Sequence, residues 1–504
     1  MFNSRKVLTD WAISESTIIC LIVLNPLFFP FWIMLPGRLT LKRLICINLR
    51  SSRRFRIGEL ERRVALSSTT SSLPPSSDGL KKSPVEKRTQ SQRGKSGRKS
   101  GGQPGHKGAT LRQTATPNHV IDHYPGLCNG CGAALMASMV ESSVARQVVD
   151  LPIPPPPEVR EHRAHLCRCA QCDTVTRAPF PEGVRAPVQY GSRISAIASY
   201  LQTHHCLPED RLALVLSDLF GLTAVPATLA RLIGRTADRL QPFVKAVRDR
   251  LSGPQVEVVH LDETGLRVQG KTQWLHVICS PLLSHFRVSP RRGDLLTGVS
   301  GLVVHDHWAP YFKMEGVEHA LCNAHHLREL QALIEIEKEA WASAMKPLLF
   351  EAKALADSPQ TDSPQIDIDA MADILQRYDE ILTDAVTFHE AQPPLQINPD
   401  TKKRRGRPKR RTGHNLALRL QKRKAEVMRF LTDPNAPFTN NEAERDLRMG
   451  KVRQKVSGCF RAMQGAETFC SLRTVTCTAR KQSWSVIETL MKSPDQLIAE
   501  MRLA

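Results

Sequence analysis

The sequence predicts an α/β fold in which short buried strands come first and long helices follow. Two apolar runs, at 256–263 (VEVVHLDE) and 301–306 (GLVVHD), are rich in β-branched residues, and each ends in carboxylate side chains. Residues 325–390 and the C-terminal block instead show the spacing of amphipathic helices. Strands followed by helices around a long insertion are typical of an α/β core with a helical insert.

The strand-like segments follow one another closely along the chain. A turn is expected at Gly265, followed by strands at 273–280 and 285–290. The second carboxylate-ended run is followed by a short strand at 319–325 (HALCNAH), after which the helical pattern begins. These segments therefore predict one sheet built mainly before residue 330.

Composition narrows the class of partner. The chain has 504 residues, of which 41% are hydrophobic, and a formal net charge of +21. The length predicts more than one folded unit. A positive surplus of this size favours a polyanionic partner, nucleic acid first and an anionic membrane surface second.

An apolar run occupies residues 17–35 (TIICLIVLNPLFFPFWIML). Its length approaches that of a membrane span and basic residues flank it, although Asn25, Pro26 and Pro30 interrupt it. One interpretation is a signal anchor. The other, which we prefer because the net charge favours a nucleic-acid partner, is that residues 1–50 or so are not native coding sequence, for example because of an upstream start. The expected location is then the cytoplasm, in association with the nucleoid.

A basic arm is expected after a short helix at 56–66. Residues 67–110 are poor in hydrophobics and rich in Ser, Gly, Pro, Lys and Arg, which predicts a disordered segment. Such an arm can neutralise phosphates, and the alternative is a flexible solubilising linker. The candidate DNA contacts in the arm are Arg98, Lys99 and Lys107.

A second basic segment, KKRRGRPKRR at 402–411, contains Arg-Gly-Arg-Pro. Gly and Pro between arginines keep a backbone extended and narrow, so the segment can enter an A·T-rich minor groove in the manner of an AT-hook. The alternative is a solvated run of charge between helices. The candidate DNA contacts here are Arg405, Arg407 and Lys409.

Two C-x-x-C pairs mark a small unit at 118–185. Four thiolates suit a closed tetrahedral Zn²⁺ site, and an odd total of 13 cysteines is a poor match to a secreted disulfide scaffold. Cys167, His162 and His165 leave other ligand sets open, and the remaining alternative is reduced cysteines without a metal. The two pairs are Cys128 with Cys131 and Cys169 with Cys172.

Residues 186–250 are expected to be helical. Within 207–235 two short apolar-periodic stretches meet near Gly221, a pattern that resembles a helix-turn-helix. An ordinary helical hairpin explains the same pattern.

Asp262 and Asp306 each follow a buried strand. Two carboxylates at neighbouring strand ends repel each other unless a cation lies between them. Oxygen ligands of this kind suit Mg²⁺, which retains water for chemistry. The two aspartates therefore predict a site for Mg²⁺ or Mn²⁺. Glu263 points away from Asp262 if the strand persists, which indicates a structural role.

A third carboxylate is expected from the segment 437–448 (PFTNNEAERDLR). Asn440 or Asn441 can cap a helix start, which places Glu444 in the first turns. Glu442 is the competitor, and it points about 200° away on an ideal helix. Arg445 and Arg448 lie beside the glutamate and are candidate DNA contacts.

A pair of metal ions held by three carboxylates can serve both cleavage and joining of DNA. One ion lowers the pKa of the attacking water or 3′-hydroxyl, and the other stabilises the leaving oxygen. His305, His307, His325 and His326 lie close in sequence to Asp306 and to Cys322. They can shape the site or contact phosphate, although packed histidines are the simpler interpretation.

From about residue 60 to the C-terminus the chain resembles the transposases of the insertion-sequence sixty-six family. Several long segments carry the resemblance in order along the chain: SSLPPSSDGLKK and SGRKSGGQPGHKGATL, CNGCGAAL and CAQC, HLDETGLRVQGKTQWLHV, VVHDHWAPYF, HALCNAHHLRELQAL, and PFTNNEAERDLRMGKVRQKVSGCFR continued through TARKQSW. Residues 1–55 do not resemble the family's leucine-zipper-like start.

The resemblance implies a ribonuclease H-like core with a helical insertion and Asp-Asp-Glu catalysis. It places the triad on Asp262, Asp306 and Glu444 rather than Glu442, and it favours the four paired cysteines as ligands of a structural Zn²⁺. It also implies action on terminal inverted repeats and target DNA, self-association on DNA, accessory proteins of the same element, and no small-molecule substrate.

The expected organisation has seven segments: 1–55, an atypical apolar start; 56–117, a short helix and the basic arm; 118–185, the zinc unit; 186–250, helices; 251–330, the first part of the core; 331–435, the helical insertion and basic linker; and 436–504, the rest of the core with Glu444. The alternative function is a catalytically decayed DNA-binding protein derived from a transposase.

Overall fold

The computed structural model describes residues 105, 108, 110–294, 298–358, 367–393, 395 and 410–502. The apolar run, the short helix at 56–66 and almost all of the basic arm lie outside the described residues, as do the candidate DNA contacts Arg98, Lys99, Lys107, Arg405, Arg407 and Lys409. In the part of the chain that the structure describes, no helix is both long enough and apolar enough to cross a membrane.

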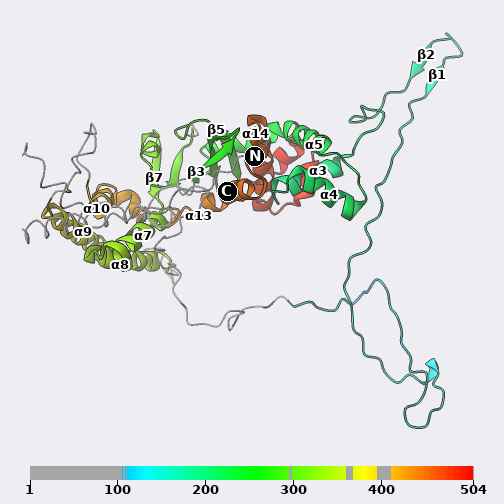
Figure 1. Ribbon diagram of the computed structural model, residues 1–504, viewed down its shortest axis with the longest axis horizontal. Coiled ribbons are helices and arrows are strands. Elements are labelled where there is room, and N and C mark those ends of the chain that lie inside the picture. Colours follow the sequence, from blue (N-terminus) through cyan, green and yellow to red (C-terminus); the bar gives the residue numbers. More distant parts are fainter. Residues whose placement is uncertain are drawn as a thin grey trace, which may run out of the picture. The chain divides into compact units, whose positions relative to one another are not determined.

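A five-stranded sheet organises the chain, with the strand order β5-β4-β3-β6-β7 (Figure 1). β3, β4 and β5 form an antiparallel meander, whereas β6 and β7 run parallel to β3. The mixed sheet and the many helices confirm the α/β expectation. The strands are β3 (Val258–Val268), β4 (Lys271–Cys279), β5 (Ser284–Ser289), β6 (Gly301–His305) and β7 (Val317–Leu321).

Two details of the strands differ from expectation. The turn predicted at Gly265 is absent, because β3 continues through Gly265, which pairs with Trp274. The chain reverses instead at Gln269 and Gly270, whose φ angles of 51° and 73° match a tight two-residue hairpin. The strand expected at 319–325 ends earlier, because a helix begins at Asn323.

Helices from both ends of the sequence share the largest buried cluster, which also covers part of the sheet. The helices expected within 186–250 are confirmed: α4 ends at Gly221, where φ is 62°, and α5 begins at Pro226. These helices are α3 (Ser192–Thr203), α4 (Glu209–Phe220), α5 (Pro226–Arg239), α6 (Gln241–Ser252), α14 (Met463–Lys481), α15 (Val486–Met491) and α16 (Pro494–Glu500).

Figure 1 shows a group of helices that follows β7 in the chain, and these helices share a second buried cluster with β6 and β7. Tyr378 is fully buried there and donates a hydrogen bond to the Leu420 carbonyl at 3.0 Å, which joins α9 to α10. The helices are α7 (Asn323–Ala332), a π-helical turn (Leu333–Glu337), α8 (Ala340–Ala356), α9 (Ile368–Glu390), α10 (Thr412–Lys422), α11 (Lys424–Val427) and α12 (Arg429–Thr432).

Helix α13 (Asn441–Ser457) follows the insertion and packs across β3 and β4. Its approach is close, because a Cβ on Gly450 would lie 2.6 Å from Leu275 Cδ2 of β4. Leu275 is fully buried, so a side chain at 450 would push the helix off the sheet. Gly450 therefore permits the contact that sets α13 against the two strands.

The expected cysteine unit contains a short antiparallel hairpin of β1 (Leu166–Arg168) and β2 (Val175–Arg177). A single 3₁₀ turn (Ala137–Met139) lies between the two cysteine pairs. Every described residue from 110 to 189 is at least partly exposed. This segment therefore contributes nothing to the buried clusters of the sheet and helices.

Candidate active site

The parallel pairing of β3 with β6 brings the two predicted aspartates side by side. His260 lies opposite Val304 in this register, so two residues further along Asp262 falls opposite Asp306. Asp306 comes directly after β6, is 8% exposed, and accepts a hydrogen bond from the Trp308 N–H at 2.9 Å. Asp306 thus follows the end of its strand as predicted, whereas the prediction for Asp262 was wrong: β3 continues to Val268, so Asp262 lies inside the strand. The register still places the two residues level with each other on neighbouring strands.

Burial and neighbouring negative charges raise the pKa values of both carboxyls. Burial, followed by the charges of Glu263, Asp306 and Glu444, raises the pKa of Asp262 well above its usual range. Burial, followed by the charge of Glu263, raises the pKa of Asp306 to about 7. Such carboxylates are stabilised in their ionised form by a neighbouring cation. The charge of Glu444 thus acts on Asp262. The three carboxylates do not, however, form a converging group of candidate metal ligands among the described residues, so the triad stays a prediction.

Glu444 reaches this site from the first turns of α13. Arg328 of α7 donates to both of its carboxylate oxygens, at 3.3 and 3.2 Å. Glu442 lies on another side of the helix, where it pairs with Arg445 at 3.0 Å and with Lys481 at 3.8 Å. The geometry of the helix therefore separates the two glutamates as the sequence predicted.

Asn440 joins the segments that carry Asp262 and Glu444. Its side-chain amide donates to the Leu261 carbonyl at 2.8 Å, beside Asp262, and its Oδ1 lies 2.9 Å from His260 Nδ1. Its backbone carbonyl accepts from the Glu444 N–H at 3.2 Å. The residue is 1% exposed, so these bonds fix the start of α13 against β3.

The expectation that an asparagine caps this helix is only half right. Asn440 does occupy the N-cap position, but its side chain caps no helical N–H. The buried carbonyl of Leu261 and the ring of His260 take the amide instead, because buried polar groups without partners are costly.

Glu263 faces away from Asp262, as the alternation of a continuous strand predicts. Its carboxylate accepts hydrogen bonds from Arg292 Nε at 2.7 Å and from the hydroxyl of Tyr311. Arg292 lies over the Trp308 ring at 4.1 Å and reaches to 4.0 Å from Asp306. The structural role expected for Glu263 is therefore accompanied by an electrostatic one, since its charge raises the pKa of both aspartates.

Sequence reasoning missed Arg292, Tyr311 and Arg328. Arg292 lies in a loop after β5, and Tyr311 in a 3₁₀ turn (Ala309–Lys313), so neither shows a pattern that marks a site. Arg328 lies six residues after Cys322 in a segment predicted only as helix. The one sequence signal that could have pointed to Tyr311 was its position, like that of Trp308, just after Asp306.

The histidines near Asp306 are packed. His305 is fully buried, with its Nε2 2.9 Å from His319 Nδ1 and its ring stacked on Tyr311 at 4.7 Å. The ring of His307 lies 5.8 Å from that of His326. Burial lowers the pKa of His305 and of His307 to about 3, so both are neutral and add no positive charge for phosphate.

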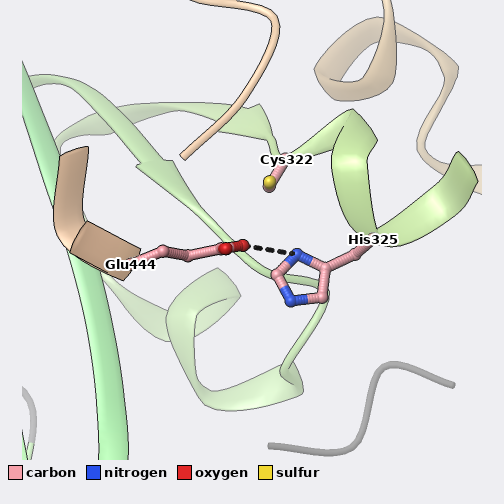
Figure 2. A group of neighbouring side chains, drawn as sticks. All are labelled: Cys322, His325 and Glu444. Carbon is pink, nitrogen blue, oxygen red and sulfur yellow. Dashed lines mark ion pairs between the residues drawn. The ribbon is translucent and has the colours of Figure 1, made fainter. Parts of the chain in front are cut away.

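A further group of possible metal ligands adjoins Glu444. Figure 2 shows Cys322 and His325, from the start of α7, pointing toward the Glu444 carboxylate. One donor atom from each residue lies within 4.8 Å of the others, and His325 Nδ1 is 3.8 Å from Glu444 Oε1. Among the described residues these three form the one group of three or more candidate ligands that converge in this way.

The two C-x-x-C pairs form turns of the same design. In each, the N–H of the first cysteine donates to the carbonyl five residues on, and its carbonyl accepts from the N–H four residues on, at 2.8–2.9 Å. The fifth residue of both turns has a positive φ, Gly132 at 76° and Asp173 at 57°. Hydrogen bonding lowers the thiol pKa of Cys128, chiefly through the Cys131 backbone, and of Cys172, chiefly through the Thr174 side chain.

One thiol of each pair is thus shifted toward the thiolate that metal binding requires. The described residues do not, however, bring the two pairs into one converging group of ligands. The four-cysteine zinc site stays a prediction. The candidate DNA contacts on α13, Arg445 and Arg448, are both exposed.

Comparison with known proteins identifies the class as transposases. Residues 187–468 match the family described as Transposase IS66 family. This match spans more than half of the chain, so the chain belongs to that family. The resemblance drawn from the sequence is confirmed, and family membership supports a transposase function, that is, an enzyme that binds and processes DNA.

The remaining comparisons add less. Residues 42–112 match a family of unknown function (DUF6444). No curated protein matches the chain. A solved structure titled "CryoEM structure of simian T-cell lymphotropic virus intasome in complex with PP2A regulatory subunit B56 gamma" aligns over 41% of this chain and 78% of its own, at 14% identity. Its TM-score of 0.13 is too low to show a shared fold.

Proposed function

We propose that this transposase is a metal-dependent Asp-Asp-Glu polynucleotidyl transferase that cleaves and joins DNA at the ends of an insertion sequence. Asp262, Asp306 and Glu444 are its catalytic residues. The observation that carries the proposal is the parallel register of β3 and β6, which sets Asp262 level with Asp306, while the charges of Asp306 and Glu444 both raise the pKa of Asp262.

The donor set fits divalent cations that prefer oxygen. Three carboxylates, two of them with raised pKa values, form a site whose repulsion a pair of Mg²⁺ or Mn²⁺ ions would relieve. When bound, such ions activate the attacking water or 3′-hydroxyl and stabilise the leaving oxygen. The sheet order, with helices inserted between β7 and α13, supports a ribonuclease H-like core for this chemistry.

The protein's own residues keep these ligands in place. Arg328 holds the Glu444 carboxylate from α7, and Asn440 holds the helix that carries it. Arg292 pairs with Glu263 and lies near Asp306, so it neutralises part of the negative charge behind the site. A rigid arrangement is needed because metal-ligand distances tolerate little displacement.

Other parts of the chain are proposed to hold DNA. Arg445 and Arg448 are exposed on the helix of Glu444, where they can contact the phosphates beside the cleaved bond. The basic arm and linker would add contacts to phosphate and minor groove. A structural Zn²⁺ on Cys128, Cys131, Cys169 and Cys172 would hold a DNA-binding or assembly module. The expected partners stay as predicted: terminal inverted repeats, target DNA, further copies of the chain and accessory proteins, in the nucleoid.

The test separates cutting from binding. We expect the full chain to nick or join terminal-repeat DNA with Mg²⁺, and Asp306→Asn to abolish both while binding the same DNA with unchanged affinity. Asp495→Asn, an exposed carboxylate on α16, is the matched control and should stay active. Binding without any cutting in Mg²⁺ or Mn²⁺ would instead establish the alternative of a decayed, DNA-binding transposase.

A further inference from the structure

Cys322 and His325 present two metal-ligand side chains on one turn of the chain. Cys322 is the N-cap residue of α7, and His325 follows three residues later. Residues three apart at a helix start lie on the same side. Glu444 completes the group from α13, and Figure 2 shows all three donors directed to a common point.

The distances are close to those of a bound ion. Donor atoms around a tetrahedral Zn²⁺ lie roughly 3.3–3.8 Å apart, given its bond lengths to oxygen, nitrogen and sulfur. His325 Nδ1 is 3.8 Å from Glu444 Oε1, a few tenths of an ångström wider than the separation of a zinc-bound nitrogen and oxygen, and the three donor atoms lie within 4.8 Å of one another. Cys322 Sγ lies within the same group and accepts a hydrogen bond from the Asn440 N–H at 3.1 Å, so it is already held beside the other two donors.

An independent observation marks His325 as a ligand. Its Nδ1 is buried and has no hydrogen-bond partner among the described residues. Buried polar atoms of this kind are uncommon in folded proteins and call for an explanation such as an ion. The unpartnered nitrogen is the one that faces Glu444.

The chemistry of the donors differs from that of the proposed magnesium centre. Thiolate and imidazole select Zn²⁺ and similar thiophilic ions, whereas an all-carboxylate set suits Mg²⁺ and Mn²⁺. Binding would release the Cys322 thiol proton to solvent. The bond from Arg328 to Glu444 need not break, because a carboxylate has lone pairs for both an arginine and an ion.

We infer that Cys322, His325 and Glu444 form a second cation site, selective for Zn²⁺, which competes with the magnesium centre for Glu444. The existence of this site stands on the geometry alone. Its consequence rests on the proposed function: while Zn²⁺ holds Glu444, the carboxylate is withdrawn from Asp262 and Asp306, and Mg²⁺-dependent cutting stops.

The first experiment measures metal binding by the full chain, without DNA. Wild type should bind one more Zn²⁺ per chain than Cys322→Ser or His325→Gln. With Co²⁺, the spectrum of wild type minus Cys322→Ser should show a thiolate-to-metal absorption band. Cys459→Ser, an exposed cysteine beyond α13, is the matched control and should bind as wild type does. The two C-x-x-C pairs are unchanged in the wild type and in all three variants, so any Zn²⁺ that they bind does not alter the difference in stoichiometry.

Equal Zn²⁺ stoichiometry in wild type and both site variants would overturn the inference. Using two variants keeps this outcome decisive if Cys322→Ser, which is deeply buried, fails to fold. Loss of one equivalent in either folded variant, with none lost in Cys459→Ser, supports it.

The second experiment adds Zn²⁺ to the Mg²⁺-dependent nicking reaction, with each protein compared to its own rate without Zn²⁺. Wild type and Cys459→Ser should be inhibited by an amount of Zn²⁺ that matches occupancy of the site, and His325→Gln should need at least about ten times more. Equal sensitivity of His325→Gln and wild type would contradict the competition. If wild type never nicks DNA, the proposed function fails while the binding result still decides the site.

Discussion

The three proposed catalytic carboxylates come from β3, from the end of β6 and from α13, and they are partly or fully buried, whereas the cysteine unit holds its candidate ligands in two exposed local turns. The carboxylates repel one another, and that repulsion is sustained by the packing of the sheet and of α13. The cysteine turns are held by their own backbone hydrogen bonds. The geometry of the carboxylate site thus depends on residues far apart in the sequence. The geometry of the cysteine unit depends on its own short turns and on the metal that they would bind.

The largest effect should come from Glu444, and its neighbour Glu442 on the same helix is the control. Glu444→Gln removes a proposed metal ligand, and we expect DNA nicking to fall by about 10²-fold or more. Glu442→Gln makes the same chemical change two residues away, beside Arg445 and Lys481, and should reduce the rate less than about threefold. Single-turnover nicking of terminal-repeat DNA measures both. Similar losses in the two variants would show that helix geometry does not choose between them.

The cysteine unit should respond to its metal rather than to packing. Removing Zn²⁺ with a chelator should increase proteolysis within 118–185 and leave the helices and sheet folded, because these share no buried cluster with the unit. Cys131→Ser should lose one Zn²⁺ per chain, and Cys167→Ser, which lies outside the two pairs, should lose none. Limited proteolysis with metal analysis reports both. Loss of the ion in Cys167→Ser would favour a different ligand set.

Asn440 tests how far the carboxylate site depends on its surroundings. Asn440→Ala leaves the Leu261 carbonyl and the His260 ring without their partner, so we expect a loss of about 3 kcal/mol in the free energy of unfolding. The Mg²⁺ concentration for half-maximal nicking should also rise, which a purely structural role would not cause. Asn435→Ala, in the exposed part of the same loop, is the control. If Asn440→Ala is destabilised but needs no more Mg²⁺ than the wild type, Asn440 stabilises the fold without positioning the metal ligands.

The smallest effect concerns the approach of α13 to the sheet. Gly450→Ala places a methyl group 2.6 Å from Leu275 Cδ2, and we expect a destabilisation of about 1–3 kcal/mol from overpacking. Gly234→Ala, on α5 with open space around its Cβ, should instead stabilise the chain by about 0.5–1 kcal/mol. Denaturant unfolding of the two variants compares them. A stabilising Gly450→Ala would mean that the helix can shift without cost.

Local sequence determined that Asp306 follows the end of a buried strand. The same prediction for Asp262 was wrong, because pairing with β4 carries β3 on to Val268 and leaves Asp262 inside the strand. The alternation of side chains along β3 did separate Asp262 from Glu263, and the helical repeat separated Glu444 from Glu442. These are properties of the backbone within one element, and a sequence pattern shows them directly.

The prediction of a turn at Gly265 was wrong because glycine also occurs inside strands. Only the pairing with β4 shows that Gly265 lies within β3 and that the chain reverses at Gln269 and Gly270. Arg292, Arg328 and Tyr311 were missed for the same reason, since each meets its carboxylate from another element. Asn440 was expected to cap its own helix and instead bonds β3.

The sequence by itself therefore determined which residues can do chemistry and on which kind of element they lie. Only the tertiary structure decided which of them meet, because the energy of a buried carboxylate depends on charges and hydrogen bonds that arrive from distant parts of the chain. The group of Cys322, His325 and Glu444 is the clearest case. Nothing in the spacing of these residues along the sequence predicts a shared site, and their side chains come together only when α7 and α13 pack.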